Sequence, residues 1–359
     1  MIPRVTATID LAAIRHNLAQ VRRAAPRSKV MAAIKADGYG HGAVPVARAL
    51  EDQADAFAVA CLEEALVLRE ARVRAPLALL EGILSMEEAK LSLRHTLQVV
   101  VHDHWQLELL EALPHGARVS LWIKLDTGMH RLGFPLADVP GLWRRIQARP
   151  EWEFLGWITH LACADEPDNP ATGEQVQAFE RALQGLPGAR SIANSAGLIA
   201  WPQSRVDWVR PGLMLYGASP MAGKIGADLG LRPAMRLETR LIAVREYPKG
   251  AALGYGATWC CPEAMPVGVA AVGYADGYHR ARPSGTPVVV CQRRVPLVGR
   301  VSMDMITLDL REAPQARVGD PVLLWGEGLP VEEIAARAGT IAYELLCGLT
   351  QRVRFVHAG

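Results

Sequence analysis

A lysine stands between an apolar run and a glycine-rich segment. The run is residues 30–34, Val-Met-Ala-Ala-Ile, and Lys35 is followed by Ala-Asp-Gly-Tyr-Gly-His-Gly. An apolar run of this length, bounded by turn residues, favours a strand buried on both faces. Lys35 would then end that strand, where partial loss of hydration makes its free amine a nucleophile for an aldehyde such as pyridoxal phosphate (PLP). A lysine that only extends from a strand end into solvent fits this stretch equally well.

Further polar residues fall at the ends of other predicted strands. In a barrel of parallel strands, functional groups collect at the carboxyl ends, so we expect these side chains to share one site. They are Lys35, Lys124, His160, Asn194 with Ser195, and Arg210.

Strand and helix patterns alternate along the first 230 residues. Strand-like runs of three to eight residues alternate with segments that carry apolar residues at helical spacing, which predicts a (β/α)8 TIM-type barrel over residues 1–230. The expected strands are 30–34, 57–60, 77–80, 97–101, 119–125, 154–161, 191–193 and part of 206–216; the expected helices are 10–24, 43–51, 62–71, 85–94, 104–113, 136–148 and 174–186.

The pattern changes near residue 230. Short β-like runs follow one another, separated by turn pairs such as Lys249-Gly250 and Ser284-Gly285, and helical patterns return only at 331–338 and 341–346. This predicts a second, mainly antiparallel β domain over residues 231–359. Its expected strands are 236–244, 267–272, 287–291, 294–297, 305–309 and 321–324.

Composition narrows the class of protein. The 359 residues carry a formal net charge of +2 and no basic run, so we expect no nucleic-acid partner. The chain has no 18-residue apolar stretch and no apolar core near its N-terminus, so we expect no membrane segment or signal peptide. Its six cysteines lack Cys-x-x-Cys spacing, which is typical of a reducing compartment. We therefore predict a cytoplasmic protein without a metal site.

The segment Ala-Ile-Lys-Ala-Asp-Gly-Tyr-Gly-His-Gly, residues 33–42, closely resembles the PLP-lysine signature of bacterial alanine racemases. Matching motifs occur in order from Ile9-Asp10 to Tyr343-Glu344, so the resemblance covers nearly the whole chain. It implies that Lys35 binds PLP covalently and that Tyr39 contacts the cofactor phosphate.

The segment 122–133, Trp-Ile-Lys-Leu-Asp-Thr-Gly-Met-His-Arg-Leu-Gly, is a second match. From its residues alone it is as readily a surface cluster of ion pairs. The resemblance implies that Arg131 bonds the PLP phenolic oxygen and the carboxylate side of the substrate. In many members of the family the lysine at the position of Lys124 is carbamylated by CO2, so the resemblance implies this modification here. A carbamate is an anion and would attract Arg131, whereas an ammonium would repel it. A lone histidine such as His160 is more often a hydrogen-bonded core residue. The resemblance implies instead that His160 packs beside the cofactor ring in a supporting role.

The segment 209–217, Val-Arg-Pro-Gly-Leu-Met-Leu-Tyr-Gly, resembles the family's cofactor-binding turn. It implies that Arg210 contacts the pyridine nitrogen. An arginine does not readily give up its proton, so the ring would be a weaker electron sink and transamination would be disfavoured. The residues that the resemblance assigns to the phosphate and its surroundings are Asn194, Ser195, Gly212, Leu213 and Tyr343.

In the second domain, Tyr255 lies between two glycines, which by itself favours a structural loop. The resemblance implies that it is the second catalytic base, delivered by the partner subunit of a homodimer, and a phenol needs positive neighbours to act as a base. The resemblance also implies that Tyr274, Met303 and Asp304 line the substrate pocket and that Arg280 and Arg300 line its entrance.

The sequence therefore predicts a PLP-dependent alanine racemase in which Lys35 and Tyr255 move protons on opposite faces of the substrate, for peptidoglycan precursors or alanine catabolism. Three alternatives remain open. A broader-specificity racemase would need a roomier pocket. A decarboxylase of basic amino acids shares the architecture but has other cofactor motifs. A PLP-binding carrier or regulator would lack the domain after residue 230.

Overall fold

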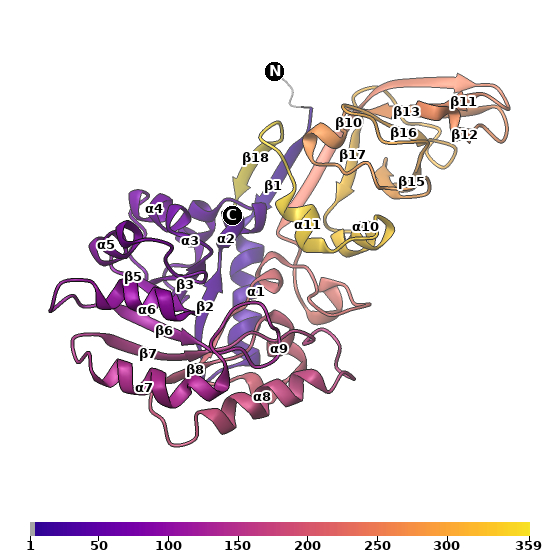
Figure 1. Ribbon diagram of the computed structural model, residues 1–359. Coiled ribbons are helices and arrows are strands. Elements are labelled where there is room, and N and C mark those ends of the chain that lie inside the picture. Colours follow the sequence, from indigo (N-terminus) through magenta and orange to yellow (C-terminus); the bar gives the residue numbers. More distant parts are fainter. Residues whose placement is uncertain (1–3) are drawn as a thin grey trace. The chain divides into compact units, whose positions relative to one another are not determined.

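The computed structural model describes residues 4–359 and divides them into two compact units. The barrel unit holds Arg15–Leu215 and Pro220–Gly223. The β unit holds the N-terminal segment up to Ile14, Tyr216–Ser219 and Lys224–Gly359. Both units are seen in Figure 1, which labels their helices and strands.

Eight parallel strands of the barrel unit close into a ring, with each strand paired to the next and β9 paired back to β2. This confirms the predicted TIM-type barrel. The strands are β2 (Lys29–Ala33), β3 (Ala56–Val59), β4 (Leu77–Leu79), β5 (Leu97–Val101), β6 (Ser120–Lys124), β7 (Glu153–Ile158), β8 (Ala189–Ser191) and β9 (Trp208–Val209).

Helices connect the barrel strands and surround them (Figure 1). At the start of α5 (Met86–Arg94), Ser85 Oγ accepts the Glu88 N–H at 3.2 Å and caps the helix. The helices are α1 (Leu11–Ala24), α2 (Lys35–Gly40), α3 (Ala43–Leu50), α4 (Leu62–Glu70), α5 (Met86–Arg94), α6 (His104–Glu111), α7 (Val139–Gln147), α8 (Ala171–Ala182) and α9 (Ser195–Ala200), with short 3-10 turns η1 (Leu136–Asp138), η2 (Pro202–Ser204) and η3 (Leu213–Tyr216).

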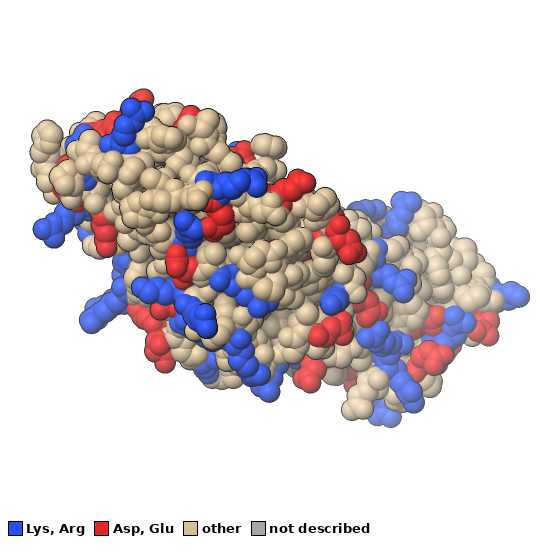
Figure 2. Space-filling model, turned by 90° about the horizontal axis from the view of Figure 1, so that it is seen from below, with Lys and Arg blue, Asp and Glu red and all other residues tan. Residues whose placement is uncertain are grey.

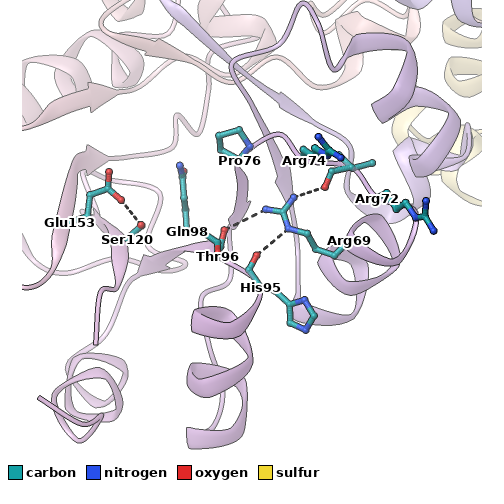
Figure 3. A pocket seen from close by; sticks show the side chains of 10 residues that line it. Arg69, Arg72, Arg74, Pro76, His95, Thr96, Gln98, Ser120 and Glu153 are labelled. Atoms are coloured by element: carbon teal, nitrogen blue, oxygen red, sulfur yellow. Dashed lines mark hydrogen bonds between the residues drawn. The ribbon is translucent and has the colours of Figure 1, made fainter. Parts of the chain in front are cut away.

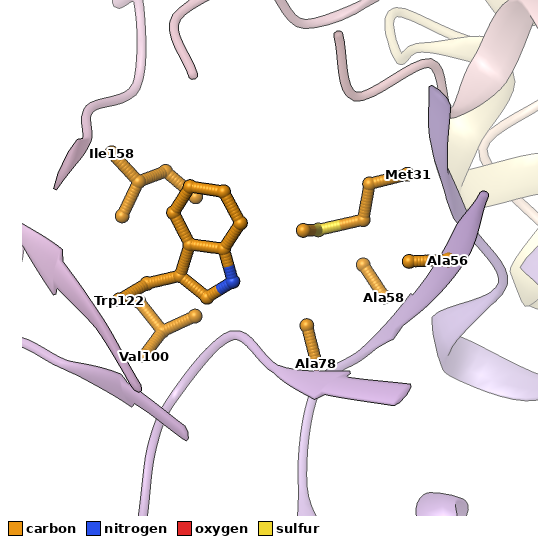
Figure 4. Close-up of a cluster of buried hydrophobic side chains, with 7 residues drawn as sticks. All are labelled: Met31, Ala56, Ala58, Ala78, Val100, Trp122 and Ile158. Atoms are coloured by element: carbon orange, nitrogen blue, oxygen red, sulfur yellow. The ribbon is translucent and has the colours of Figure 1, made fainter. Parts of the chain in front are cut away.

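The barrel interior is filled by one large side chain and several small ones. Trp122 points inward from β6, and its indole Nε1–H donates to Gln98 Oε1 at 3.0 Å. Alanines from β3 and β4 leave room for it, as Figure 4 shows. Large and small residues on facing strands therefore fill the barrel without a pore. The cluster consists of Met31, Ala56, Ala58, Ala78, Val100, Trp122 and Ile158.

The β unit contains an eight-stranded, mainly antiparallel sheet, as predicted, in the order β13-β16-β15-β14-β17-β10-β1-β18. The thirteen-residue β10 pairs with β17 through its first half and with β13 through its second half, so six of the strands close on themselves. The elements are β1 (Thr6–Asp10), β10 (Met235–Tyr247), β11 (Ala252–Leu253), β12 (Trp259–Cys260), β13 (Met265–Ala270), β14 (Pro287–Val290), β15 (Arg293–Val298), β16 (Ile306–Asp309), β17 (Pro321–Trp325) and β18 (Arg354–Ala358), with η4 (Gly226–Leu229), η5 (Tyr255–Ala257), η6 (Tyr274–Asp276), α10 (Val331–Arg337) and α11 (Ala342–Cys347).

Two strands of the eight-stranded sheet, β1 and β18, were not anticipated from the sequence, and neither was the separate two-stranded sheet of β11 and β12. The N-terminal β1 lies between β10 and β18, antiparallel to the first and parallel to the second. Strand β18 lies at the other end of the chain. The first residues of the chain thus complete a sheet whose other strands come from the last third of it.

Basic and acidic side chains are interspersed over the face shown in Figure 2, with uncharged surface between them. No helix among residues 4–359 is long and apolar enough to cross a bilayer.

Candidate active site

The barrel brings the predicted strand-end residues to one end. Lys35 follows β2, Lys124 is the last residue of β6, and His160 comes two residues after β7. Ser195 opens α9 beyond β8, and Arg210 directly follows β9. Because all these strands are parallel members of one closed barrel, their carboxyl ends form a single rim.

Positive charge is concentrated at this rim. Burial, together with the charges of Arg210, Arg131 and Lys35, lowers the pKa of Lys124 to about 8, against a weaker opposing effect of Asp126. A minor fraction of Lys124 is therefore the neutral amine at neutral pH, more than for an ordinary lysine. Four cationic side chains close enough to perturb one another make this rim a receptor for anions.

The same charges keep His160 neutral. Burial, followed by the effects of Arg210 and Lys124, lowers the pKa of this imidazole to about 3. His160 therefore enters any reaction at physiological pH without a charge. Its backbone carbonyl accepts a bond from Gln175 Nε2 at 3.1 Å, which fixes the segment after β7 to α8.

Arg210 is the most deeply buried of the cations, with 7% of its surface exposed. Its Nη1 donates to Ser191 Oγ at 2.6 Å, and its Nη2 donates to the carbonyls of Thr159 and, at 3.2 Å, Ile192. Burial lowers the pKa of Arg210 to about 9, so it stays charged at neutral pH. Within residues 4–359 no carboxylate forms an ion pair with it, and neutral acceptors alone orient the guanidinium.

The backbone directly after Lys35 turns in the left-handed sense. Ala36, Asp37, Gly38 and Tyr39 have φ of 52°, 51°, 63° and 53° and ψ between 41° and 51°, so α2 is a turn of left-handed helix. Each non-glycine residue in this conformation costs about 1–2 kcal/mol. Such strain persists only where the surrounding structure imposes it.

Side chains brace this turn from both sides. The Ala36 N–H donates to Glu64 Oε1 at 2.7 Å, and the Ala43 N–H donates to Asp37 Oδ1 at 2.7 Å. The buried His41 donates through Nδ1 to the Tyr39 carbonyl at 2.8 Å. The turn is therefore held in one geometry, which fixes Tyr39 relative to Lys35.

The turn carries Tyr39 to the segment after β9. A Cβ built on Gly212 would lie 2.5 Å from Tyr39 Oη, so only glycine allows this approach. The Gly212 N–H donates to Ser195 Oγ at 2.8 Å, and the N–H of Met214, next to Leu213 in η3, reaches the same oxygen at 3.4 Å. A phenol, a hydroxyl and backbone amides thus meet in one corner of the rim.

This corner fits the phosphate of PLP, since backbone N–H groups and hydroxyls are the donors that phosphates take in proteins. Lys35 on the neighbouring strand supplies an amine for the aldehyde. Asn194 has a local role here: its Oδ1 accepts the Gly197 N–H at 2.8 Å and caps α9. The residues present therefore fit the cofactor that the sequence predicts.

The remaining predicted residues lie together in the β unit. Tyr255 is in η5 with 64% of its surface exposed. Arg280 Cζ lies 5.9 Å from the Tyr255 ring centre and 6.0 Å from that of Tyr274, and its Nη1 donates to the Val301 carbonyl at 2.7 Å. Arg300 Nη1 would lie 3.3 Å from a Cβ on Gly256. Arg280 therefore lies over the Tyr255 ring, and Arg300 lies beside the next residue along the chain.

Met303 and Asp304 lie between β15 and β16, within four residues of Arg300. Tyr343 is on α11. These residues and the Tyr255 group belong to the β unit, whereas Lys35 and its neighbours belong to the barrel unit.

The opposite end of the barrel also has a cavity, of about 690 Å³ (Figure 3). Here Arg69 donates to the carbonyls of Val73, Ala75 and His95 at 2.8–3.1 Å, so its guanidinium ties loops together instead of facing a ligand. Burial lowers the pKa of Arg69. The cavity lies at the amino ends of the strands, which in this fold serve stability.

Comparison with known proteins agrees with this geometry. Family models described as the N-terminal and C-terminal domains of alanine racemase match residues 9–220 and 234–357. The chain belongs to the alanine racemase family. An alanine racemase from Nitrosococcus oceani is 56% identical over 97% of both chains, and one from Halorhodospira halophila is 50% identical over 97% of this chain and 96% of the relative.

Solved structures of the family have the same fold. The biosynthetic alanine racemase from Pseudomonas aeruginosa superposes with a TM-score of 0.97 at 46% identity, covering 100% of both chains. The alanine racemase from Acinetobacter baumannii gives 0.94 at 36% identity, covering 99% of this chain and 100% of the other.

Sequence reasoning missed several residues that orient the site. Ser191 and the Thr159 carbonyl hold Arg210, and Glu64 braces the turn after Lys35. Ser191 offered one signal, a hydroxyl at the start of the otherwise apolar predicted strand 191–193. The individual roles of the predicted site residues stay predictions.

The left-handed turn leads to a stability prediction with an unusual sign. Replacing the exposed Ala36 by glycine keeps its N–H bond and removes the steric cost of positive φ, so the free energy of unfolding in urea should rise by about 0.5–1 kcal/mol. The matched control is Ala19→Gly on the exposed face of the right-handed α1, which should lower it by about 1 kcal/mol. Unfolding of both variants would be followed by circular dichroism. An equal fall in the free energy of unfolding for both substitutions would contradict the left-handed geometry.

Proposed function

We propose that this chain interconverts L-alanine and D-alanine with PLP bound covalently to Lys35. The observation that carries the proposal is the corner in which Tyr39, Ser195 and Gly212 meet beside a strand-end lysine. Membership of the alanine racemase family supports it.

When bound, PLP supplies an electron-withdrawing ring that makes the Cα–H bond of an attached amino acid acidic. Tyr39, Ser195 and the amides of Gly212 and Leu213 would hold its phosphate, with Tyr343 as a further contact and Asn194 fixing the segment that carries Ser195. Arg210 would donate to the ring nitrogen and keep its own proton. The neutral His160 would pack beside the ring without adding charge.

The substrate carboxylate would be held by Arg131 and the Met303 N–H, because the rim attracts anions. Tyr274 and Asp304 would line the rest of the pocket, and Arg280 and Arg300 its entrance. This arrangement would orient Cα towards the proton-transferring groups.

Two bases on opposite faces of Cα are needed for racemisation in both directions. Tyr255 Oη would remove the proton from L-alanine while Lys35 Nζ returns one to the other face, and the reverse would hold for D-alanine. Arg280, whose guanidinium lies 5.9 Å from the Tyr255 ring centre, would help to orient the phenol. A positioned base contributes roughly 10²–10⁴-fold to the rate.

We further propose that each site is shared between two subunits of a homodimer, with Tyr255 supplied by the partner subunit. The exposure of Tyr255, with Tyr274, Met303 and Tyr343 also exposed in the β unit, is suited to a face that another chain covers. A role in supplying D-alanine is favoured, since the similar Pseudomonas aeruginosa structure is described as biosynthetic; alanine catabolism is the alternative.

Lys35→Ala should lose both the cofactor bond and the reaction. Borohydride reduction and peptide mapping of the PLP-loaded wild type should label Lys35, and the variant should racemise at least ~10³-fold more slowly. Lys90→Ala, at an exposed lysine on α5, is the matched control and should behave as wild type. Labelling without alanine turnover would favour a broader-specificity racemase or a PLP carrier, and no labelling would refute the proposal.

Tyr255→Phe should keep the label and lose roughly 10²–10⁴-fold in proton removal from L-alanine, while Tyr247→Phe should not. Mixing Lys35→Ala with Tyr255→Phe subunits should restore activity to about a quarter of wild type, because random exchange makes half of the dimers hybrids with one complete site of two. Proven subunit exchange without any rescue would mean that each site is built from one chain.

Lys124 should form a carbamate. Its neutral amine nitrogen would attack the carbon of CO2, form an N–C bond and release one proton, leaving an anion that pairs with Arg131. Because the pKa of Lys124 is about 8, more of its amine is protonated below that pH, and the carbamylated fraction of Lys124 should fall. A ¹³C NMR carbamate signal from labelled bicarbonate should appear in wild type and in Lys90→Gln but not in Lys124→Gln. A signal that persists in Lys124→Gln would assign the modification elsewhere.

A further inference from the structure

Two turns of the β unit are joined through their backbones. The Tyr274 N–H donates to the Ser302 carbonyl and the Ala275 N–H donates to the Met303 carbonyl, both at 3.1 Å. The first turn is η6, and the second is residues 302–305, called the 302–305 turn below. They carry the three residues assigned above to the substrate pocket, so the two turns form one backbone unit around it.

The contact between these turns leaves no spare room. A Cβ on Gly273, the residue before η6, would lie 2.3 Å from the carbonyl oxygens of both Ser302 and Met303. The Gly273 N–H donates to Asp276 Oδ2 at 2.9 Å. Asp276 is only 2% exposed, so its other carboxylate oxygen needs a partner that reaches into the turn.

That partner is Arg352, which precedes β18. Its Nε lies 3.2 Å from Asp276 Oδ1, and its Nη2 donates to Asp304 Oδ1 at 2.7 Å. One planar guanidinium thus joins the buried carboxylate of η6 to the carboxylate of the 302–305 turn. The fork of an arginine can span two carboxylates in this way, whereas the single ammonium of a lysine cannot hold both in the same geometry.

Other contacts fix the guanidinium and the far side of the 302–305 turn. The Thr350 hydroxyl donates to the Ala275 carbonyl at 2.8 Å and accepts the Arg352 N–H at 3.3 Å. Arg4 Nη2 donates to the Asp304 carbonyl at 2.9 Å. The segment 350–352 is therefore tied to η6 by backbone and side chain, which restricts where Arg352 can place its charge.

We propose that Arg352 is a positioning residue for substrate binding: by bridging Asp276 and Asp304, it sets the backbone of the 302–305 turn so that the Met303 N–H meets the substrate carboxylate. The inference rests on the proposed function, because it uses the assignment of Met303 to that carboxylate. Arg352 itself touches no reacting atom. Loss of Arg352 should weaken the binding of the substrate carboxylate equally in the bound substrate and in the transition state. KM should therefore rise while kcat changes little.

The test is steady-state racemisation by the PLP-loaded full chain. Arg352→Met should raise KM for alanine by about 10-fold and leave kcat within about 3-fold, and Arg352→Lys should restore part of the difference because it keeps one ion pair. Propionate, which has the carboxylate of alanine without its amine, should lose affinity as an inhibitor by the same factor. Arg354→Met, two residues along and exposed, is the matched control and should leave KM unchanged.

Amide hydrogen exchange separates this inference from the proposed function. Arg352→Met should speed exchange at residues 302–305 and 273–277, and Arg354→Met should not. Faster exchange in an enzyme that does not racemise alanine would refute the function and keep the positioning role. An active enzyme whose KM and exchange are unchanged by Arg352→Met would overturn the inference. A fall in kcat alone would also overturn it, because it would indicate a role in proton transfer.

Discussion

Mutual repulsion between positive side chains is the constraint on which the candidate site depends. Lys35, Lys124, Arg131 and Arg210 lie near one end of the barrel, and Arg210 is buried against neutral oxygens. Burying an unpaired charge lowers the free energy of unfolding, and packing elsewhere in the barrel must compensate for this loss. Burial first, and the neighbouring positive charges second, lower the pKa values of Lys124 and His160, so both groups lose a proton more readily than in water. A phosphate and a carboxylate would relieve the same repulsion.

The second cost at this site is conformational. Three non-glycine residues of α2 have positive φ, a cost of about 3–6 kcal/mol in total. The bonds from Glu64, Asp37 and His41 each return about 1 kcal/mol, and the packing of the surrounding barrel provides the rest. Strain of this kind is typical of functional sites, where it pre-organises groups that must act together. Here it ties Tyr39 to Lys35 over four residues.

The barrel and the strand-end residues could be predicted from the sequence because apolar runs that end in one polar residue are local signals. The left-handed turn could not be, because alanine, aspartate and tyrosine prefer right-handed or extended backbone, and one of its braces, Glu64, lies 28 residues from the N–H that it accepts. The partners of Arg210 escaped prediction for the same reason, since Thr159 is 51 residues away. Strand β10 was recognised only up to residue 244, because two consecutive charged residues, Arg245 and Glu246, follow and end the apolar pattern although the strand continues to Tyr247.

Strand β1 has a consequence for how the molecule is made. It leaves the ribosome well before both of its partners, β10 and β18, which come much later in the chain. The barrel strands all lie within residues 15–215 and can pair as they emerge, whereas β1 must wait for β18, about 340 residues behind it. At 5–20 residues per second that delay is roughly 20–70 s. Until β18 emerges, β1 lacks its partner on one side, and an unpaired strand edge is a template for pairing with another chain.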